Sequence, residues 1–195
     1  MPKTTMKTTR LTLIIPMATL IAGCLTSSPV ERTDWNVECT DAALRVAEKP
    51  KFGVVRLSLV ELRAPYTVRE VAVLRPNGSI AFDPFNAYAA TPVQLLKGVA
   101  LEALSRSGLF SSVVGSGSSV DSDVEAEVAV ARLALDCREE GVRRAVAAVS
   151  VRLVRSHGIV ASADGVGSAD ASQPNYSAAL SAAVTSAFSD ALNKL

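Results

Sequence analysis

The thiols and the imidazole of this 195-residue chain are the side chains best suited to redox chemistry and zinc binding: Cys24, Cys39, Cys137 and the single histidine, His157. Their spacing matches neither a CxxC pair nor an HExxH helix, so the sequence predicts no metal site. His157 stands beside Gly158 in a turn. A catalytic histidine needs a nucleophile and an acid around it, which a hairpin tip rarely encloses. We therefore interpret His157 as a solvated turn residue, and we expect neither an enzyme activity nor a cofactor.

Cys24 ends a segment with the layout of a secretory signal. Basic residues occur within the first ten positions, and an apolar run follows from Leu11 to Ala22. This run is too short for a membrane-spanning helix, which needs roughly twenty residues. The residues Ile21–Cys24 resemble the lipobox of bacterial lipoproteins. The resemblance implies a signal peptide over 1–23 and a mature chain that begins at Cys24, which carries a diacylglycerol and an N-acyl group such as palmitate. The alternative is an ordinary signal peptide with a chance cysteine.

Residues 24–34 are expected to be a lipidated tether. From residue 25 onward they show no hydrophobic periodicity and contain serine and proline, which favours a flexible connection. Ten extended residues reach at most ~35 Å, so the single domain predicted over 35–195 has to lie close to the membrane. Leu25 and Thr26 follow Cys24 without the aspartate that suggests inner-membrane retention. By analogy, we expect the periplasmic face of the outer membrane.

Charge and cysteine content limit the partners and the covalent cross-links. Removing the three basic residues of the signal leaves 17 of the 20 basic residues against all 19 acidic ones. A near-neutral chain without a basic stripe does not favour nucleic acid as a partner. Cys39 and Cys137 would then lie in an oxidising compartment. They either form a disulfide or remain two small buried side chains, and their spacing does not decide between these alternatives.

Alternating apolar residues predict most of the strands. The predicted strands cover residues 35–39, 52–62, 69–75, 79–82, 109–114, 123–135, 145–153 and 159–166. The alternation changes phase near Ala131, which predicts a β-bulge there. Residues 83–90 and 115–119 are expected to be loops.

Two segments have helical periodicity. The first begins at a marked point, because Thr91 can act as N-cap, Pro92 suits the first helical position and Gln94 completes a capping box. Gly108 suits its C-terminal end. The second covers 176–195, with apolar residues at steps of three and four. The order of elements predicts an α+β fold: a mainly antiparallel sheet with two amphipathic helices packed on one face.

Phe82, Phe85 and Tyr88 are the strongest candidates for a contact site. Aromatic residues beside a helix start either cover the end of the sheet or form an exposed apolar patch for a partner protein or a lipid. Residues 138–144 hold a cluster of mixed charge, which is either a solvated hairpin tip or a surface for an acidic partner.

The segment Val54–Val114 contains an ordered pattern of strand, turn and helix residues. In chain order the pattern comprises the strand ending near Leu62, Ala64-Pro65-Tyr66, Val71 to Arg75, the return to Phe82, Tyr88 before Pro92, Leu95-Leu96 to Leu104, and Gly108-Leu109-Phe110. This pattern resembles the ABC-type transport auxiliary lipoproteins, which accompany intermembrane lipid-transport systems containing MCE-domain proteins in Gram-negative bacteria. One departure is Tyr88, because such proteins often have tryptophan in that loop.

The resemblance implies a non-enzymatic accessory subunit anchored in the outer membrane. Its partners would be a periplasmic MCE-domain protein and the ABC permease and ATPase. The cargo of this system would be phospholipid or another hydrophobic molecule. The subunit is also a possible homo-oligomer. A second hypothesis is a lipoprotein adaptor or activator of another cell-envelope machine, for outer-membrane assembly or cell-wall synthesis. An envelope hydrolase is a third hypothesis, which the lone His157 disfavours.

Overall fold

The computed structural model describes residues 31–40, 44, 46–156, 158–171 and 176–195. The chain divides into two compact units, Met1–Glu31 and Arg32–Leu195, and every element described below belongs to the second. The expected signal peptide, the lipidated Cys24, most of the tether and His157 lie outside the described residues. In the described part of the chain, no helix is both long and apolar enough to cross a membrane.

Eight strands and two helices make up the described fold. In chain order they are β1 (Thr33–Trp35), β2 (Phe52–Leu62), β3 (Glu70–Leu74), β4 (Ile80–Tyr88), α2 (Pro92–Arg106), β5 (Phe110–Gly115), β6 (Val124–Asp136), β7 (Arg144–Arg155), β8 (Gly158–Asp170) and α3 (Tyr176–Asn193). The expected α+β class is confirmed. The strand over 52–62 and the helix start at Tyr176 lie where the sequence predicts them.

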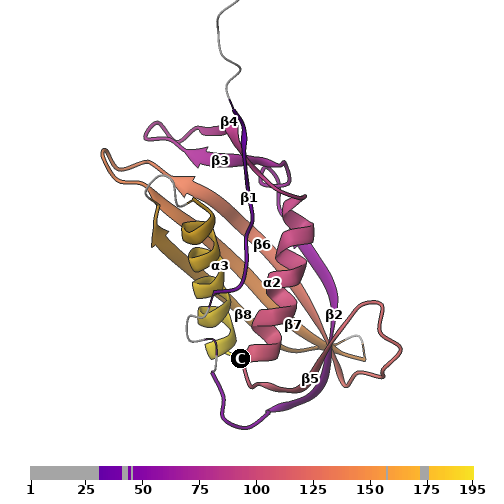
Figure 1. Cartoon of the computed structure of the whole chain (residues 1–195). Helices are drawn as coiled ribbons and strands as arrows, with labels where there is room; N and C mark the ends of the chain where they lie inside the picture. The colour runs from indigo at the N-terminus through magenta and orange to yellow at the C-terminus, as the bar shows by residue number, and fades with distance from the viewer. Residues whose placement is uncertain (1–30, 41–43, 45, 157, 172–175) are drawn as a thin grey trace, which may run out of the picture. The chain divides into compact units, whose positions relative to one another are not determined.

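The long strand β6 organises the sheet (Figure 1). One edge of β6 pairs with β7, and its other edge pairs first with β2 and then, at Leu135 and Asp136, with β3. β8 extends the sheet beyond β7, β5 lies beside β2, and β4 and β1 follow β3. The register between β6 and β7 shifts between Val130 and Arg132, which confirms the bulge expected near Ala131.

The expectation of a mainly antiparallel sheet is wrong, because the sheet is mixed. Strands joined by short turns are antiparallel, as in β3–β4, β6–β7 and β7–β8. The pairs β1–β4, β2–β5, β2–β6 and β3–β6 are parallel. Parallel neighbours need a crossover between them, so they are distant in sequence, and a local pattern of alternation does not reveal them.

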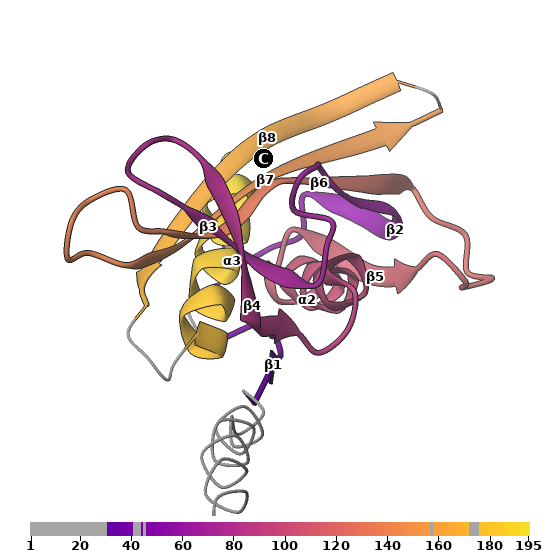
Figure 2. The same cartoon turned by 90° about the horizontal axis from the view of Figure 1, so that it is seen from above.

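Both helices pack on the same face of the sheet, as expected (Figure 2). Two glycines in β8 allow α3 to approach the strand closely. A Cβ at Gly165 would lie 2.0 Å from the carbonyl oxygen of Ala187, and one at Gly167 would lie 2.1 Å from that of Ala183. The small residues of both elements therefore bring the helix backbone directly against the strand.

The polar side of α3 is also covered, which its amphipathic pattern does not suggest. After β1 the chain continues along this helix, in the space between α2 and α3 (Figure 1). Ser181 Oγ accepts a hydrogen bond from the amide of Glu38, and Thr185 Oγ1 accepts one from the amide of Thr40, each at 3.0 Å. The first strand is consequently shorter than expected: it covers Thr33–Trp35, and residues 36–40 lie along α3.

Two local expectations differ from the structure around α2. The residues expected to form a loop before this helix belong to β4, which runs to Tyr88 because its last three residues pair with β1. Pro92 begins the helix, but the hydroxyl of Thr91 donates to Gln94 Oε1 at 2.8 Å, and no side chain caps the helix amides. Gly108 follows the helix with φ +76°, in agreement with its expected role.

Candidate functional site

The candidate site lies where the described chain begins, at β1 and the β3–β4 hairpin. Thr33 pairs with Asn86 and Trp35 pairs with Tyr88, in parallel register. Arg69 supports this pairing because its Nε donates to the carbonyl oxygen of Tyr88 at 2.9 Å. Exposed ion pairs surround β1: Arg32 with Asp34 and Glu70, and Arg69 with Asp34. Pairs of this kind contribute little to stability, but together they favour one position for a three-residue strand.

Trp35 connects β1 to two other elements. Its Nε1 donates to Asn86 Oδ1 at 2.7 Å, and its ring lies 5.6 Å from the ring of Tyr176 at the start of α3. The Tyr176 hydroxyl in turn accepts a hydrogen bond from Arg143 Nη1 at 2.5 Å. The guanidinium carbon lies 5.6 Å from the tyrosine ring centroid, and the hydrogen bond to the hydroxyl describes this contact better than stacking on the ring face. At the end of the domain that holds β1, hydrogen bonds and a ring contact therefore join side chains from distant parts of the sequence.

Three large apolar side chains of β4, the strand that pairs with β1, are exposed. Ile80, Phe82 and Phe85 have exposed fractions of 38%, 40% and 48%, and we call these three residues the hairpin patch. Ile80 and Phe82 point to the same side because strand residues two apart share a face. Phe85 lies in a bulge of β4, since Val71 pairs with Asp83 whereas Glu70 pairs with Ala87.

Tyr88, the third aromatic residue of the predicted contact site, lies in the core instead. Its exposed fraction is 2%, and its hydroxyl has no hydrogen-bond partner among the described residues. Burial raises the pKa of Tyr88 well above its ordinary value. Phe82 and Phe85 are thus both exposed on the surface, whereas Tyr88 is buried in the core. Sequence reasoning missed Ile80, although its spacing of two from Phe82 was a usable signal.

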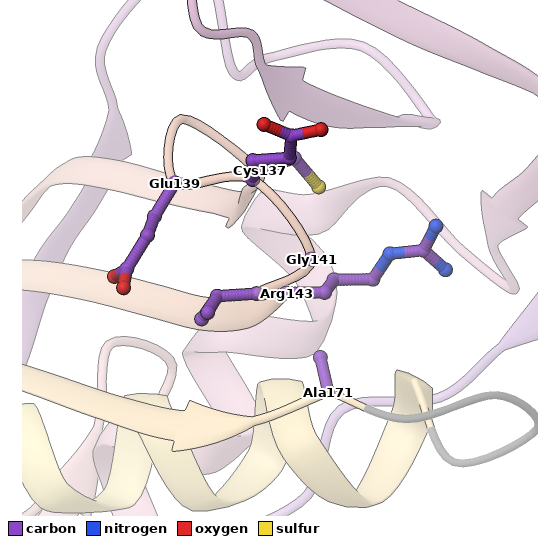
Figure 3. A pocket seen from close by; sticks show the side chains of 7 residues that line it. Cys137, Glu139, Gly141, Arg143 and Ala171 are labelled. Carbon is purple, nitrogen blue, oxygen red and sulfur yellow. The ribbon is translucent and has the colours of Figure 1, made fainter.

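The loop between β6 and β7 borders an open hollow of about 480 Å³ next to this end of the domain (Figure 3). Cys137, Gly141, Arg143 and Ala171 are among its lining residues. Figure 3 shows the side chains of Glu139 and Arg143 pointing in opposite directions. Acid–base catalysis requires such groups to converge on a reacting atom, so this arrangement suits binding better than catalysis.

The charged residues of this loop are largely engaged with one another. Arg138 pairs with Asp136 at 2.5 Å, and Arg144 pairs with Glu139 at 3.8 Å. The hydrogen bond from Arg138 holds the pKa of the Asp136 carboxyl below its usual value. The mixed-charge cluster is therefore internally compensated, and it offers no concentrated charge to a partner.

Cys39 and Cys137 are both free thiols in the structure and lie in different surroundings. Cys39 lies beside α3, with its sulfur 4.0 Å from Arg106 Nη1. Burial and, to a lesser extent, the negative charge of Glu102 raise the pKa of the Cys39 thiol, so it stays protonated at neutral pH. Cys137 lines the hollow described above. No group of three potential metal ligands occurs within residues 31–40, 44, 46–156, 158–171 and 176–195.

Comparisons with known proteins extend to the fold alone. No protein-family model matches the chain, and no curated protein matches it. The crystal structure of protein XCC0632 from Xanthomonas campestris, described as DUF330, is 17% identical, with 82% of this chain and 87% of that chain covered and a TM-score of 0.59. A crystal structure described as an uncharacterized protein is 10% identical, with 82% and 92% covered and a TM-score of 0.58. The likeness shows that other chains adopt this arrangement of sheet and helices.

Proposed function

We propose that this chain is a lipid-anchored periplasmic accessory subunit of an ABC/MCE-type transporter that moves phospholipid or other hydrophobic cargo between the two membranes. The observation that carries the proposal is the lipobox-like sequence Ile21–Cys24, placed nine residues before β1. The resemblance of Val54–Val114 to the auxiliary lipoproteins supplies the partner, and the lipid on Cys24 supplies the attachment to the outer membrane.

The chemistry of the described surface is compatible with a subunit that binds rather than reacts. Two ion pairs, Arg138–Asp136 and Arg144–Glu139, lie at the β6–β7 loop. The β1 end exposes ion pairs together with the apolar side chains of the hairpin patch. A subunit of this kind would act by holding its partner at a fixed distance from the membrane. The nine positions from Cys24 to Thr33 would keep the start of β1 within ~30 Å of the membrane.

Cross-linking in intact cells tests the proposal. The wild-type chain, tagged at its C-terminus, is cross-linked and purified from the outer membrane, and a periplasmic MCE-domain protein is expected to be recovered with it. A strain that lacks the gene is expected to lose detergent resistance and to regain it when the wild-type gene is supplied. Cys24→Ala is the matched variant, because it leaves every described residue unchanged and is expected to restore little resistance.

Normal lipid distribution in the deletion strain, together with no MCE-domain protein in the cross-linked material, would exclude the proposed role. Recovery of a cell-wall synthase or an outer-membrane assembly protein instead would favour the adaptor hypothesis.

A further inference from the structure

The hairpin patch holds three of the nine large apolar side chains that are exposed among the described residues, and Ile159 and Val160 of β8 are two of the others. Ile80, Phe82 and Phe85 lie within six residues of one short strand, and each exposes more than a third of its surface. Neighbouring apolar residues that stay exposed together mark a surface for a lipid or a protein. The surroundings of the patch indicate which of the two it meets.

The direction of the chain places the patch on the side from which β1 begins. β1 and β4 run parallel, with Thr33 opposite Asn86 and Trp35 opposite Tyr88. The backbone at Thr33 therefore points back toward the first half of β4, which holds Ile80 and Phe82, and away from Tyr88. Figure 1 shows β1, β3 and β4 at the same end of the folded unit.

The length of chain before β1 limits how far the start of β1 can lie from a lipid surface. Thr33 lies nine positions after Cys24, and nine extended residues span at most ~30 Å. This step rests on the proposed anchor at Cys24. Given that anchor, the patch is held beside the bilayer at a high effective concentration, and even a weak affinity for the interface is then sufficient for contact.

The charges around the patch also suit a phospholipid surface. Asp83 is the acidic residue of β4, and its carboxylate is occupied within the hairpin: it accepts from the amide of Phe85 at 2.9 Å and from Asn86 Nδ2 at 2.8 Å. Arg75, in the turn that joins β3 to β4, is exposed. A hairpin with outward phenylalanines, an engaged carboxylate and an exposed guanidinium is compatible with anionic headgroups and the acyl region beneath them.

We propose that the hairpin patch inserts into the interface of the membrane that holds the lipid of Cys24, as a second contact that fixes the orientation of the domain. With one attachment the domain would rotate freely about its tether. With two attachments, the open hollow, α2 and α3 keep constant directions relative to the bilayer. A fixed orientation is useful to a subunit that has to meet a partner approaching from the periplasm.

Tryptophan fluorescence in vesicles tests this second contact. Lipidated full-length protein is purified from membranes and reconstituted into vesicles of phosphatidylethanolamine and phosphatidylglycerol, with or without bromine on the acyl chains. Phe82→Trp and Phe85→Trp report on the patch. Ile159→Trp is the matched control, because Ile159 is 63% exposed on β8 at the far end of the β7–β8 pair from Arg144. The native Trp35 is present in all variants as a common background.

The expected result is an emission that falls about twofold in brominated vesicles for either patch variant, as insertion to the headgroup–acyl boundary requires, and stays unchanged for Ile159→Trp. Circular dichroism melts show whether each variant is folded. If one of the two patch variants does not fold, the other still reports on the patch. Equal quenching at Phe82, Phe85 and Ile159, or quenching at none of them, would overturn the second contact while leaving the anchor in place. A blue shift without quenching would also overturn it, because the patch would then be buried against protein, such as a second copy of this chain. Failure of the protein to remain with the vesicles would overturn the anchor and the second contact together.

Discussion

The side of β8 that contacts α3 and the β3–β4 hairpin use apolar residues in opposite ways. On the first side, Phe188, Ala187 and Ala183 are completely buried, and glycines at 165 and 167 of β8 let the helix backbone meet the strand. On the second side, a strand of nine residues leaves Ile80, Phe82 and Phe85 partly exposed to solvent. Burial of apolar surface is the main source of folding stability, so the first region stabilises the domain. The second region leaves apolar surface available for contacts outside the domain.

Substituting the same residue type in both regions gives the largest expected difference. Phe188→Ala should destabilise the domain by about 3–5 kcal/mol, because it opens a cavity in the core. Phe82→Ala should cost less than about 1 kcal/mol, since that side chain is already 40% exposed. Urea unfolding followed by circular dichroism measures both values. Equal losses of unfolding free energy in the two variants would contradict the difference between the two regions, because the hairpin patch would then be part of the core.

A single added methyl group probes the contact between helix and strand. Gly165→Ala should destabilise the domain by about 3 kcal/mol, because the new Cβ would lie 2.0 Å from the Ala187 carbonyl oxygen and α3 would have to move. Gly117→Ala is the matched control, because a Cβ there meets nothing within 4 Å. The control should be neutral or slightly stabilising. Thermal melts of the two variants that cannot be distinguished would mean that α3 does not pack directly on β8.

Removing one hydroxyl tests how α3 holds the segment that follows β1. Thr185→Val keeps the shape of the side chain but leaves the amide of Thr40 without its acceptor. We expect a loss of about 1–2 kcal/mol and faster proteolysis near residues 36–40. Thr185→Ser retains the hydroxyl and should keep the segment protected. Protection in Thr185→Val equal to that of the wild type would show that other contacts hold this segment.

The smallest expected effect is a pH-dependent change in melting temperature, and it concerns Asp190 at the outer edge of β8. Asp190 accepts from the amide of Val166 at 3.0 Å and pairs with Lys194 at 2.8 Å, and these contacts lower the pKa of its carboxyl below the usual 3.8. A lowered folded-state pKa stabilises the fold above the unfolded-state pKa, and the stabilisation is lost as pH falls through the folded-state value. Asp190→Asn should therefore melt slightly below the wild type at pH 7 and at the same temperature in strong acid. A difference that persists in strong acid would point to packing as its cause.

Local sequence pattern predicted much of this fold. The bounds of β2, the start of α3 at Tyr176 and the bulge after Val130 all follow from periodicity in neighbouring residues. The parallel pairs do not, because β2 and β6 are joined through β3, β4, α2 and β5 before they meet. The close approach at Gly165 was also invisible, because a glycine in a strand does not reveal which element lies against it.

In the candidate site, too, the sequence predicted local features but not contacts between distant residues. Phe82 and Phe85 could be selected from the sequence as loop aromatics, although they lie on a strand. Tyr88 was grouped with them, but it lies in the core, because the pairing of β4 with β1 extends the strand into the interior. The contacts of Trp35 with Tyr176, and of Tyr176 with Arg143, join residues far apart in the chain. No local pattern predicts such pairs.

The central claim is that the domain is held to a membrane through Cys24 at the end where β1 begins. Intact-mass measurement of the protein purified from membranes tests this claim most directly. We expect a chain that begins at Cys24 and carries the added mass of a diacylglycerol and one further acyl chain. An unmodified chain, or one that begins at another residue, would contradict it.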